Sequence, residues 1–227
     1  MTDPNDIARS AAAAAAVPLV EPGMTIGLGS GRAVWKVVEQ LAARGEPVRA
    51  AVASNRTAEL ARASGIEIVE LNGDVELDLA LDGADEVDPS LGLIKGGGGA
   101  LLREKIVISA ARRFVVVAET AKRVERLGEQ FRLPVEVVRF AWRDTRRRLA
   151  ALLPDAELRA SEQGDPYLTD EGHLLLDCAL PAGSHPAELD LALRRVPGVV
   201  EHGLFLGMAE RALLGRPDGG VDELRGG

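Results

Sequence analysis

The hydrophobic and polar positions in the first half of the chain follow two spacings in turn. Residues 25–28 form a short apolar run, and residues 33–43 place apolar side chains at positions i, i+3, i+4 and i+7. The first pattern is typical of a buried strand, and the second puts its apolar residues on one face of a helix. A glycine-rich segment lies between them. The pattern therefore predicts a strand, a tight turn and a helix.

The same alternation continues as far as residue 118. Asp3 and Pro4 are typical of a helix start, and we expect the alanine-rich helix that they begin to end near Pro18. The last predicted strand of this half contains five successive apolar residues, as in a strand buried on both faces. Strands that alternate with helices form a largely parallel sheet. The further expected strands are residues 48–53, 66–69, 77–81 and 114–118, and the further helix is residues 57–63.

Beyond about Gly128 the order of elements changes to β-α-β-β-α-β, which resembles a small ferredoxin-like unit. The tail after Gly207 is apolar and then glycine-rich, and we expect it to return to the first domain. We therefore predict a larger domain of residues 1–128 plus 207–227 and a smaller one of residues 129–206. The elements predicted for the smaller domain are a strand at 135–140, a helix at 143–153, a hairpin-like pair around 170–172, a helix at 186–195 and a last strand.

Composition and charge narrow the class of protein. The 227 residues are 46% hydrophobic and 27% charged, which is typical of a globular chain rather than a disordered one. The longest uncharged apolar stretch, residues 10–20, is too short for a bilayer span. The formal charge of −8 argues against a broad nucleic-acid surface, and the acidic N-terminal segment does not resemble a signal peptide. We therefore expect a cytoplasmic protein that binds neither membrane nor nucleic acid.

Cysteine and histidine are too sparse for a structural metal or a disulfide framework. Cys178 is the single cysteine, and His173, His185 and His202 lack the spacing of a zinc site. We interpret these residues as structural. The same interpretation is given to Trp35 and Trp142, and the arginine cluster at residues 143–148 is interpreted as a solvated helix face.

The first segment that could carry chemistry, residues 27–32, has the sequence GLGSGR. Glycines between a strand and a helix let backbone amides approach an anion, and the helix N-terminus adds partial positive charge. A phosphate is therefore the expected ligand, with a plain tight turn as the alternative. The segment is not a dinucleotide fingerprint, because Arg32 stands where the third glycine is needed and Ser54 stands where an acidic ribose ligand is expected.

The second segment, residues 81–88, has the sequence LDGADEVD and places four carboxylates just after an apolar strand. Open α/β sheets bind their ligands at this end of their strands. Crowded carboxylates raise one another's pKa, which suits groups that exchange protons with sugar hydroxyls. A solvated acidic turn is the alternative. A calcium loop is excluded, because the spacing of its acidic residues is missing.

The third segment, residues 95–105, has the sequence KGGGGALLREK and is the most informative. Four successive glycines carry a large cost in conformational entropy, so they favour close approach of the backbone to a ligand over an ordinary connection. Glu104 follows on the predicted helix, with no cation at the i±3 or i±4 positions. A partly desolvated carboxylate of this kind has a raised pKa, as a general base requires. The alternative is an ordinary surface glutamate.

Several segments match one known family in order along the chain. They are GLGSG, SNRTAELARASGI, LDGADE, IKGGGGALLREKIV, LPVEV and PGVVEHGLF. Together they closely resemble the type A ribose-5-phosphate isomerases. The resemblance implies an α/β fold, a Rossmann-like parallel-sheet domain with an inserted smaller ferredoxin-like α+β domain. It also implies a homo-oligomer, a dimer or a tetramer, that needs no cofactor or metal and interconverts D-ribose 5-phosphate and D-ribulose 5-phosphate in the non-oxidative pentose phosphate pathway.

The resemblance implies roles for the residues at matching positions. Glu104 is expected to move a proton between C1 and C2 through a cis-enediolate, while Asp82 and Asp85 serve ring opening and proton transfer at the sugar oxygens. Lys95 and the amides of residues 96–98 are expected to stabilise the developing oxyanion, and these residue types suit such chemistry. The expected substrate-binding residues are Ser30, Gly31, Arg32, Ala33, Gly83, Ala84, Gly96, Gly97, Gly98 and Lys122.

The sequence departs from the family pattern in the phosphate loop and in the first helix. The loop usually reads GTGST and here reads GSGRA, so it lacks two hydroxyls and gains the Arg32 guanidinium, which either binds the phosphate bidentately or narrows the pocket. A lysine of the first helix corresponds to Ala8, with Arg9 beside it, which leaves one cationic contact open. Two other functions stay open. One is a sugar-phosphate binding or sensory protein on the same scaffold, and the other, disfavoured by DGADE and the glycine run, is a relative of the acyl-CoA transferases.

Overall fold

The computed structural model describes residues 3–226, and its larger part is a seven-stranded sheet with the order β14-β13-β7-β4-β1-β2-β3. Counted from β3, this is the 3-2-1-4-5-6 order of doubly wound sheets, with one antiparallel strand added at the edge. The predicted Rossmann-like parallel sheet is therefore confirmed. Its strands are β1 (Thr25–Leu28), β2 (Arg49–Val52), β3 (Glu67–Ile68), β4 (Leu79–Asp82), β7 (Phe114–Glu119), β13 (Arg211–Gly215) and β14 (Val221–Arg225).

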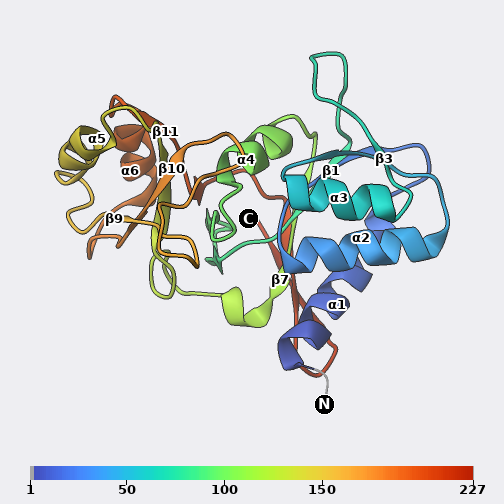
Figure 1. Ribbon diagram of the computed structural model, residues 1–227. Coiled ribbons are helices and arrows are strands. Elements are labelled where there is room, and N and C mark those ends of the chain that lie inside the picture. The colour runs from blue at the N-terminus through green and yellow to red at the C-terminus, as the bar shows by residue number, and fades with distance from the viewer. Residues whose placement is uncertain (1–2, 227) are drawn as a thin grey trace.

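Helices cover both faces of this sheet, because its central strands are apolar on both sides. Every residue of β7 is buried, as the run of apolar residues predicted. Three helices bury apolar residues in one core cluster that also contains Leu79 and Leu81, and the fourth packs on the opposite face through Val107 and Ile108 (Figure 1). The helices are α1 (Pro4–Ala16), α2 (Arg32–Arg44) and α3 (Asn55–Ala63) on the first face and α4 (Leu101–Ser109) on the second, with the short 3-10 helices η1 (Val17–Leu19) and η2 (Thr120–Lys122).

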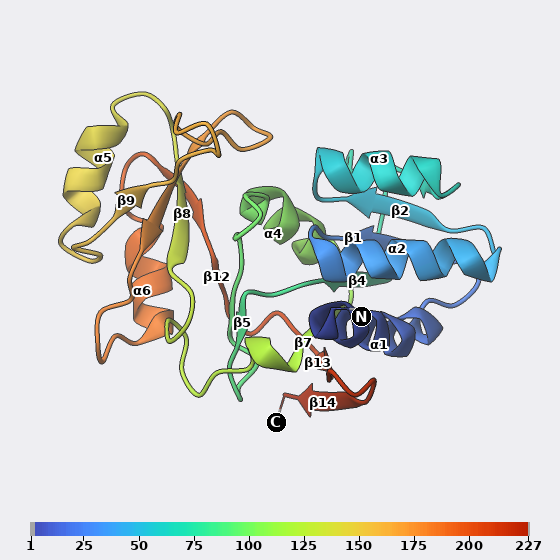
Figure 2. The same cartoon turned by 60° about the horizontal axis from the view of Figure 1, so that its bottom comes forward.

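A second sheet lies beside the first, on the far side of α4 (Figure 2). Its order is β11-β8-β10-β9, and all of its pairs are antiparallel. The elements follow the predicted β-α-β-β-α-β order, and their apolar faces form a core of their own. The predicted ferredoxin-like α+β unit is therefore present. Its elements are β8 (Leu133–Val137), α5 (Trp142–Leu149), β9 (Glu157–Leu158), β10 (Leu174–Cys178), α6 (Pro186–Leu193) and β11 (Val199–His202).

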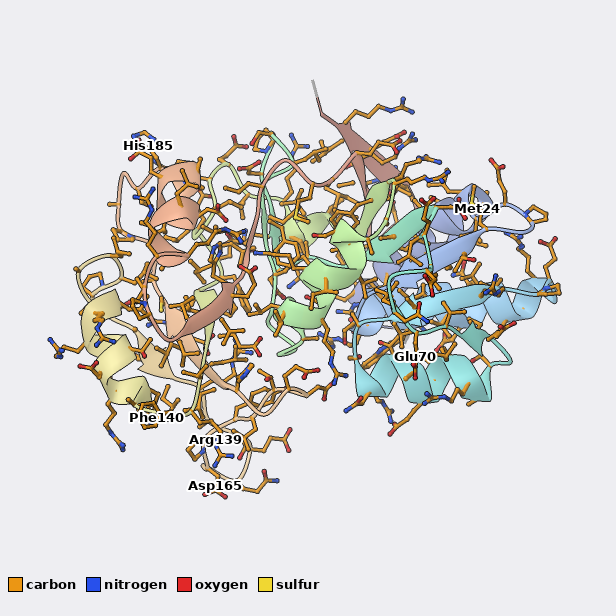
Figure 3. All side chains as sticks on the ribbon, turned by 90° about the horizontal axis from the view of Figure 1, so that it is seen from above. Met24, Glu70, Arg139, Phe140, Asp165 and His185 are labelled. Atoms are coloured by element: carbon orange, nitrogen blue, oxygen red, sulfur yellow. The ribbon has the colours of Figure 1, made fainter. Side chains whose placement is uncertain are left out.

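One strand predicted for this unit has wrong bounds. The strand predicted at residues 135–140 ends at Val137, because its two neighbours pair no further; Phe140 is 88% exposed and lies with Arg139 at the outer edge of the unit (Figure 3). The hairpin-like pair around residues 170–172 is present as a turn closed by an antiparallel bridge between Leu168 and Leu174, while the regular partner of β10 is β9.

A third sheet, β12-β6-β5, is absent from the sequence prediction. Each of its strands has two residues, too few to show any periodicity. The strands are β5 (Glu86–Val87), β6 (Leu93–Ile94) and β12 (Leu204–Phe205). This sheet joins the loop after β4 to the end of the smaller unit, and the tail then returns to the main sheet as β13 and β14, as expected.

The predicted larger domain includes Met1, Thr2 and Gly227, which lie outside the described residues. Within residues 3–226, the helices are too short or too polar for any of them to cross a membrane. The domain boundaries at residues 128 and 207 stay predictions.

Candidate active site

A cavity of about 380 Å³ lies at the carboxyl ends of β1, β4 and β7. The strand order reverses between β1 and β4, and this is where doubly wound sheets bind ligands. The three segments selected from the sequence meet here: the first two follow the parallel strands β1 and β4, and the third follows β6 of the small antiparallel sheet. The predicted site residues that line the cavity are Ser30, Gly31, Arg32, Ala33, Gly83, Ala84, Asp85, Lys95, Gly96, Gly97, Gly98, Glu104 and Lys122.

Lys95 forms the centre of the site. Its Nζ lies 2.9 Å from Oδ2 of Asp82 and 3.3 Å from Oε2 of Glu104, and it donates to the Gly83 carbonyl at 2.6 Å. The side chains of all three ionisable residues are at most 6% exposed. The contact with the Gly83 carbonyl is the hydrogen bond among these three, whereas Oδ2 of Asp82 and Oε2 of Glu104 pair with the ammonium by charge, so Lys95 still has N–H donors for a ligand.

The chain positions Lys95 and Glu104 by anchoring both to the segment that joins β11 and β12. The Lys95 N–H donates to the Gly203 carbonyl at 2.9 Å. Glu104 lies in the first turn of α4, and its neighbour Lys105 donates to the Glu201 carboxylate at 2.9 Å and to two carbonyls of the same segment. The smaller unit therefore fixes the helix that carries Glu104 as well as the strand end that carries Lys95.

Burial sets the electrostatics of this cluster. It raises the pKa of Glu104 to about 8, and the nearby charge of Asp82 adds to the rise. Burial also raises the pKa of Asp82. Burial alone would lower the pKa of Lys95, but the negative charges of Asp82 and Glu104 outweigh it, so the pKa of Lys95 lies above its ordinary value. The cluster thus combines a lasting positive charge with a carboxyl group that gains and loses a proton near neutral pH.

Asp82 is not among the residues that line the cavity, and its expected role in proton transfer at the sugar oxygens stays a prediction. Its side chain is fully buried behind Lys95, and its Oδ1 accepts hydrogen bonds from the amides of Ser30 and Gly83 at 3.2 and 2.7 Å. The carboxyl group also packs directly on the backbone of Gly29, where an added Cβ would lie 1.8 Å from its carbon. These contacts hold Asp82 against Lys95.

The other carboxylates of the acidic segment have separate partners. Asp85 lines the cavity, and its Oδ2 accepts from the Gly97 amide at 2.7 Å. Glu86 is fully buried and accepts from three amides of the chain that leads into the smaller unit. Asp88 closes a turn by accepting from Ser90. Asp82 and Asp85 therefore lie beside Lys95 or the cavity, where their predicted role stays a prediction, whereas Glu86 and Asp88 bind only backbone and side-chain groups of their own surroundings.

The other end of the cavity is built for an anion. Gly31 precedes α2 with φ +100°, a backbone conformation that favours glycine, and no side chain caps the first amides of this helix. The side chain of Arg32 is exposed beside it, and Lys122 contributes a second cation. The Ser30 hydroxyl lies 3.0 Å from that of Ser54.

Arg9 is a cavity residue that the sequence prediction left open. Its side chain is buried, lines the cavity and pairs with Glu119 at 2.6 Å. Arg9 therefore places a guanidinium at the cavity, next to the position of Ala8. A signal was available: Arg9 shares the buried alanine face of α1, where an unpaired arginine is unfavourable. Trp35 also lines the cavity, whereas it was interpreted as a packing residue.

Groups of three or more His, Cys, Asp or Glu side chains that could hold a metal ion are absent from residues 3–226. Cys178 is buried in the core of the smaller unit, and burial raises the pKa of its thiol to about 12. His202 is likewise buried, and burial lowers its pKa to about 4.

Fold and site together define a class of protein: a doubly wound α/β chain with an attached α+β unit, whose cavity contains a buried carboxylate, a buried lysine and the uncapped N-terminus of a helix. The sequence pattern of ribose 5-phosphate isomerase A (phosphoriboisomerase A) matches residues 49–219. This match covers more than half of the 227 residues, and the chain belongs to the ribose 5-phosphate isomerase A family.

Curated relatives and solved structures agree with this assignment. The chain is 51% identical over 219 residues to the ribose-5-phosphate isomerase A of Roseiflexus castenholzii, covering 94% of each chain, and 46% identical over 225 residues to that of Synechococcus sp., covering 97% of each. The ribose 5-phosphate isomerase A structure from Methanocaldococcus jannaschii superposes with a TM-score of 0.89 at 36% identity, covering 96% of this chain and 97% of that one. A D-ribose-5-phosphate isomerase in complex with phospho-erythronic acid superposes with a TM-score of 0.90 at 33% identity and the same coverage.

Proposed function

We propose that the protein is an aldose-ketose isomerase that interconverts D-ribose 5-phosphate and D-ribulose 5-phosphate, a reaction of the non-oxidative pentose phosphate pathway. The observation that carries this proposal is the buried pair of Glu104 and Lys95 at 3.3 Å, on the wall of a cavity whose other end suits a phosphate. The reaction moves one proton between neighbouring carbons. It therefore needs a base of near-neutral pKa and a positive charge beside the developing oxyanion.

The residues divide the reaction between them as follows. Glu104 removes the proton from C2 of the open-chain aldose and returns it to C1, while a hydroxyl proton passes from O2 to O1 through the cis-enediolate. Lys95 and the glycine run of residues 96–98 stabilise the negative oxygen of that intermediate, although the Gly97 amide already donates to Asp85. Asp85, which lines the cavity, exchanges protons with the sugar hydroxyls during ring opening. Asp82 acts through Lys95 by holding its ammonium in place.

The phosphate binds at the N-terminus of α2. The free amides at this helix end and the Ser30 hydroxyl donate to its oxygens, and Arg32 and Lys122 supply charge. Arg9 of α1, which lines the cavity, adds a third cation. The guanidinium of Arg32 takes over the role of the hydroxyls that the loop lacks.

The relative solved with phospho-erythronic acid supports this assignment. That ligand carries a phosphate at one end and a carboxylate at the other, and a planar carboxylate resembles an enediolate in shape and charge. An enzyme complementary to an enediolate binds such an acid tightly. The cavity of this chain has charges to match both ends.

We further propose a cytoplasmic homo-oligomer, a dimer or a tetramer, built from a domain of residues 1–128 plus 207–227 and a domain of residues 129–206. The resemblance to the family supports the oligomer; the exposed apolar side chains of Ile106, Phe140 and Leu191 lie on separate elements and do not by themselves define an interface. Light scattering of the purified chain tests the oligomeric state, and a monomer at micromolar concentration would refute this part.

The test of function is the interconversion of the two sugar phosphates in EDTA, with the Glu104→Gln variant assayed in parallel. We expect turnover in the parent and a loss of about 10²–10⁴-fold in kcat for the variant, the range that a general base contributes. If the parent does not turn over ribose 5-phosphate but binds it in calorimetry, the protein is a sugar-phosphate binding or sensory protein. A glutamyl-CoA adduct on Glu104, detected by mass spectrometry, would favour the transferase alternative.

A further inference from the structure

The glycine run of the site is held from outside by two side chains of the smaller unit. Nη1 of Arg159 donates to the carbonyls of Gly96 and Gly97 at 2.9 and 3.1 Å, and the Tyr167 hydroxyl donates to the Gly98 carbonyl at 3.2 Å. Three successive carbonyls are therefore bound by residues that follow β9. Neither of these two side chains is among the residues that line the cavity, whereas the three glycines are.

The planarity of the peptide bond turns these contacts into a constraint on the amides. The described chain contains no cis peptide bond, so the carbonyl of one residue and the N–H of the next point in opposite directions. The Gly96–Gly97 peptide shows this directly, because its carbonyl is held by Arg159 while its N–H donates to Asp85 on the cavity wall. The run therefore lies between Arg159 and the cavity.

The same reasoning places the N–H of Gly98. Its peptide shares a plane with the Gly97 carbonyl, which Arg159 holds, so the N–H points away from Arg159 and toward the cavity that Gly98 lines. In the part of the chain that the structure describes, this N–H donates to no protein acceptor. An added Cβ on Gly98 would meet no atom within 4 Å, so the space beside it is open to a ligand.

Arg159 is itself rigidly held. Its Nε and Nη2 donate to the two carboxylate oxygens of Asp177 on β10 at 2.9 and 2.5 Å, and its side chain is 13% exposed. Its backbone carbonyl accepts from the Tyr167 amide at 2.9 Å, which keeps the two side chains adjacent. A guanidinium presents donors on both edges of one plane, so Arg159 can bind Asp177 and the glycine carbonyls at the same time. A lysine has no such geometry.

We propose that Arg159, fixed by Asp177, is a positioning residue for the oxyanion site: it orients the Gly98 amide toward the negative oxygen of the reaction intermediate. The inference rests on the proposed isomerase function and adds the smaller unit to the catalytic apparatus. A glycine run has many accessible conformations, so a restraint outside the cavity is needed to keep its amides preorganised. Tyr167 supports the same orientation by holding the next carbonyl.

The experiment compares the parent with Arg159→Met and Arg159→Lys. We expect Arg159→Met to lower kcat by about 10- to 100-fold, somewhat less than the removal of an oxyanion donor, with KM changed less than about two-fold. Affinity for phospho-erythronic acid, which carries a negative oxygen, is expected to fall by a similar factor. Affinity for ribitol 5-phosphate, which has neither carbonyl nor carboxylate, is expected to stay constant. Arg159→Lys should fall between parent and Arg159→Met, and it carries the test if the methionine variant does not fold.

The matched control is Arg44→Met. Arg44 also donates to two backbone carbonyls, those of Val17 and Val20, and also pairs with a carboxylate, that of Glu46, but it touches neither the glycine run nor Asp177. We expect this variant to keep the kinetics and both affinities of the parent. An equal kinetic loss in Arg44→Met, an unchanged kcat in Arg159→Met, or an equal loss of affinity for the two ligands would each overturn the positioning role.

The two hypotheses fail in different ways. Absence of turnover in the parent refutes the isomerase function alone. In that case binding still tests the role of Arg159. The ratio of the affinity for phospho-erythronic acid to that for ribitol 5-phosphate is measured in the parent and in Arg159→Met, and the two ratios are compared. A selective loss for the acid supports the inference, and an unchanged ratio refutes it.

Discussion

Replacing Glu104 by glutamine is expected to make the protein more stable while it abolishes turnover. Burial raises the pKa of Glu104 to about 8, from an ordinary value of 4.5. When folding raises the pKa of a carboxyl group, the folded state keeps its proton at pH values where the unfolded chain has already lost it. Over that pH range a rise in pH therefore favours the unfolded chain. Its stabilising contribution is full below pH 4.5 and is lost as the pH rises toward 8. Glutamine mimics the neutral carboxyl group and does not titrate.

The size of the effect follows from this difference in pKa. At pH 7 the unfolded glutamate has lost its proton, whereas the folded one has largely kept it, and the gap of 2.5 pH units above the ordinary pKa corresponds to about 3 kcal/mol. The glutamine variant avoids this cost, so its free energy of unfolding should exceed that of the parent by about 3 kcal/mol at pH 7. The gain should be near zero at pH 4.5 and level off above pH 8.

Chemical denaturation of both proteins between pH 4.5 and 8.5 measures this gain. Glu210→Gln is the control of opposite sign, because hydrogen bonds from Arg113 and Arg211 lower the pKa of Glu210 to about 2 and its removal should destabilise the protein above that pH. In the parent, kcat/KM should rise with pH as the base of the cluster loses its proton. A gain that is absent or constant over this pH range would show that Glu104 is ionised at neutral pH, and the reasoning on burial would then be refuted.

Two further predictions concern the anion site and acid stability. Arg32→Ala should raise KM about 10-fold with little change in kcat, because the exposed guanidinium contacts the unreactive phosphate; a fall in kcat at constant KM, measured by steady-state kinetics, would exclude this role. Burial lowers the pKa of His202 to about 4 from 6.5, so the folded state resists protonation and stability should fall by up to about 3 kcal/mol as the pH drops from 6.5 to 4. In the His202→Asn variant, unfolding should take up about one proton less over that range, so the free energy of unfolding should change less steeply with pH. An unchanged slope would contradict the assignment.

The sequence predicted those parts of the fold whose signal is local. Residues 25–28 coincide with β1, and residues 114–118 lie in β7, because an unbroken apolar run has one favourable state between two helical layers. The first two chemistry-bearing segments could also be placed at one edge of the sheet, since loops after parallel strands share that edge, whereas the third follows β6, a strand outside the parallel sheet. Strands of two residues, such as β6 and β12, show no periodicity and could not be found in this way.

Contacts between segments were harder to predict than the segments themselves. Glu104 has no cation at helical spacing, and its partner Lys95 lies before the helix, brought back by the turn of residues 96–99. Asp82 and Asp85 look equivalent in the sequence, but one is buried behind Lys95 and the other faces the cavity. The direction of a side chain in a loop depends on turn geometry, which composition and spacing do not encode.

The division of labour between the two sheets explains why the site needs both. The main sheet supplies the anion site and the carboxylates from loops whose positions are set by its strands. The glycine run, the least restrained segment of the cavity wall, is instead fixed by the smaller unit, through Gly203 at the Lys95 amide and through Arg159 at two glycine carbonyls. Lys105 extends the same support to the helix of Glu104 by binding Glu201. Because preorganised donors stabilise an oxyanion only when their directions are fixed beforehand, the smaller unit contributes to the reaction without any of these supporting groups touching the sugar.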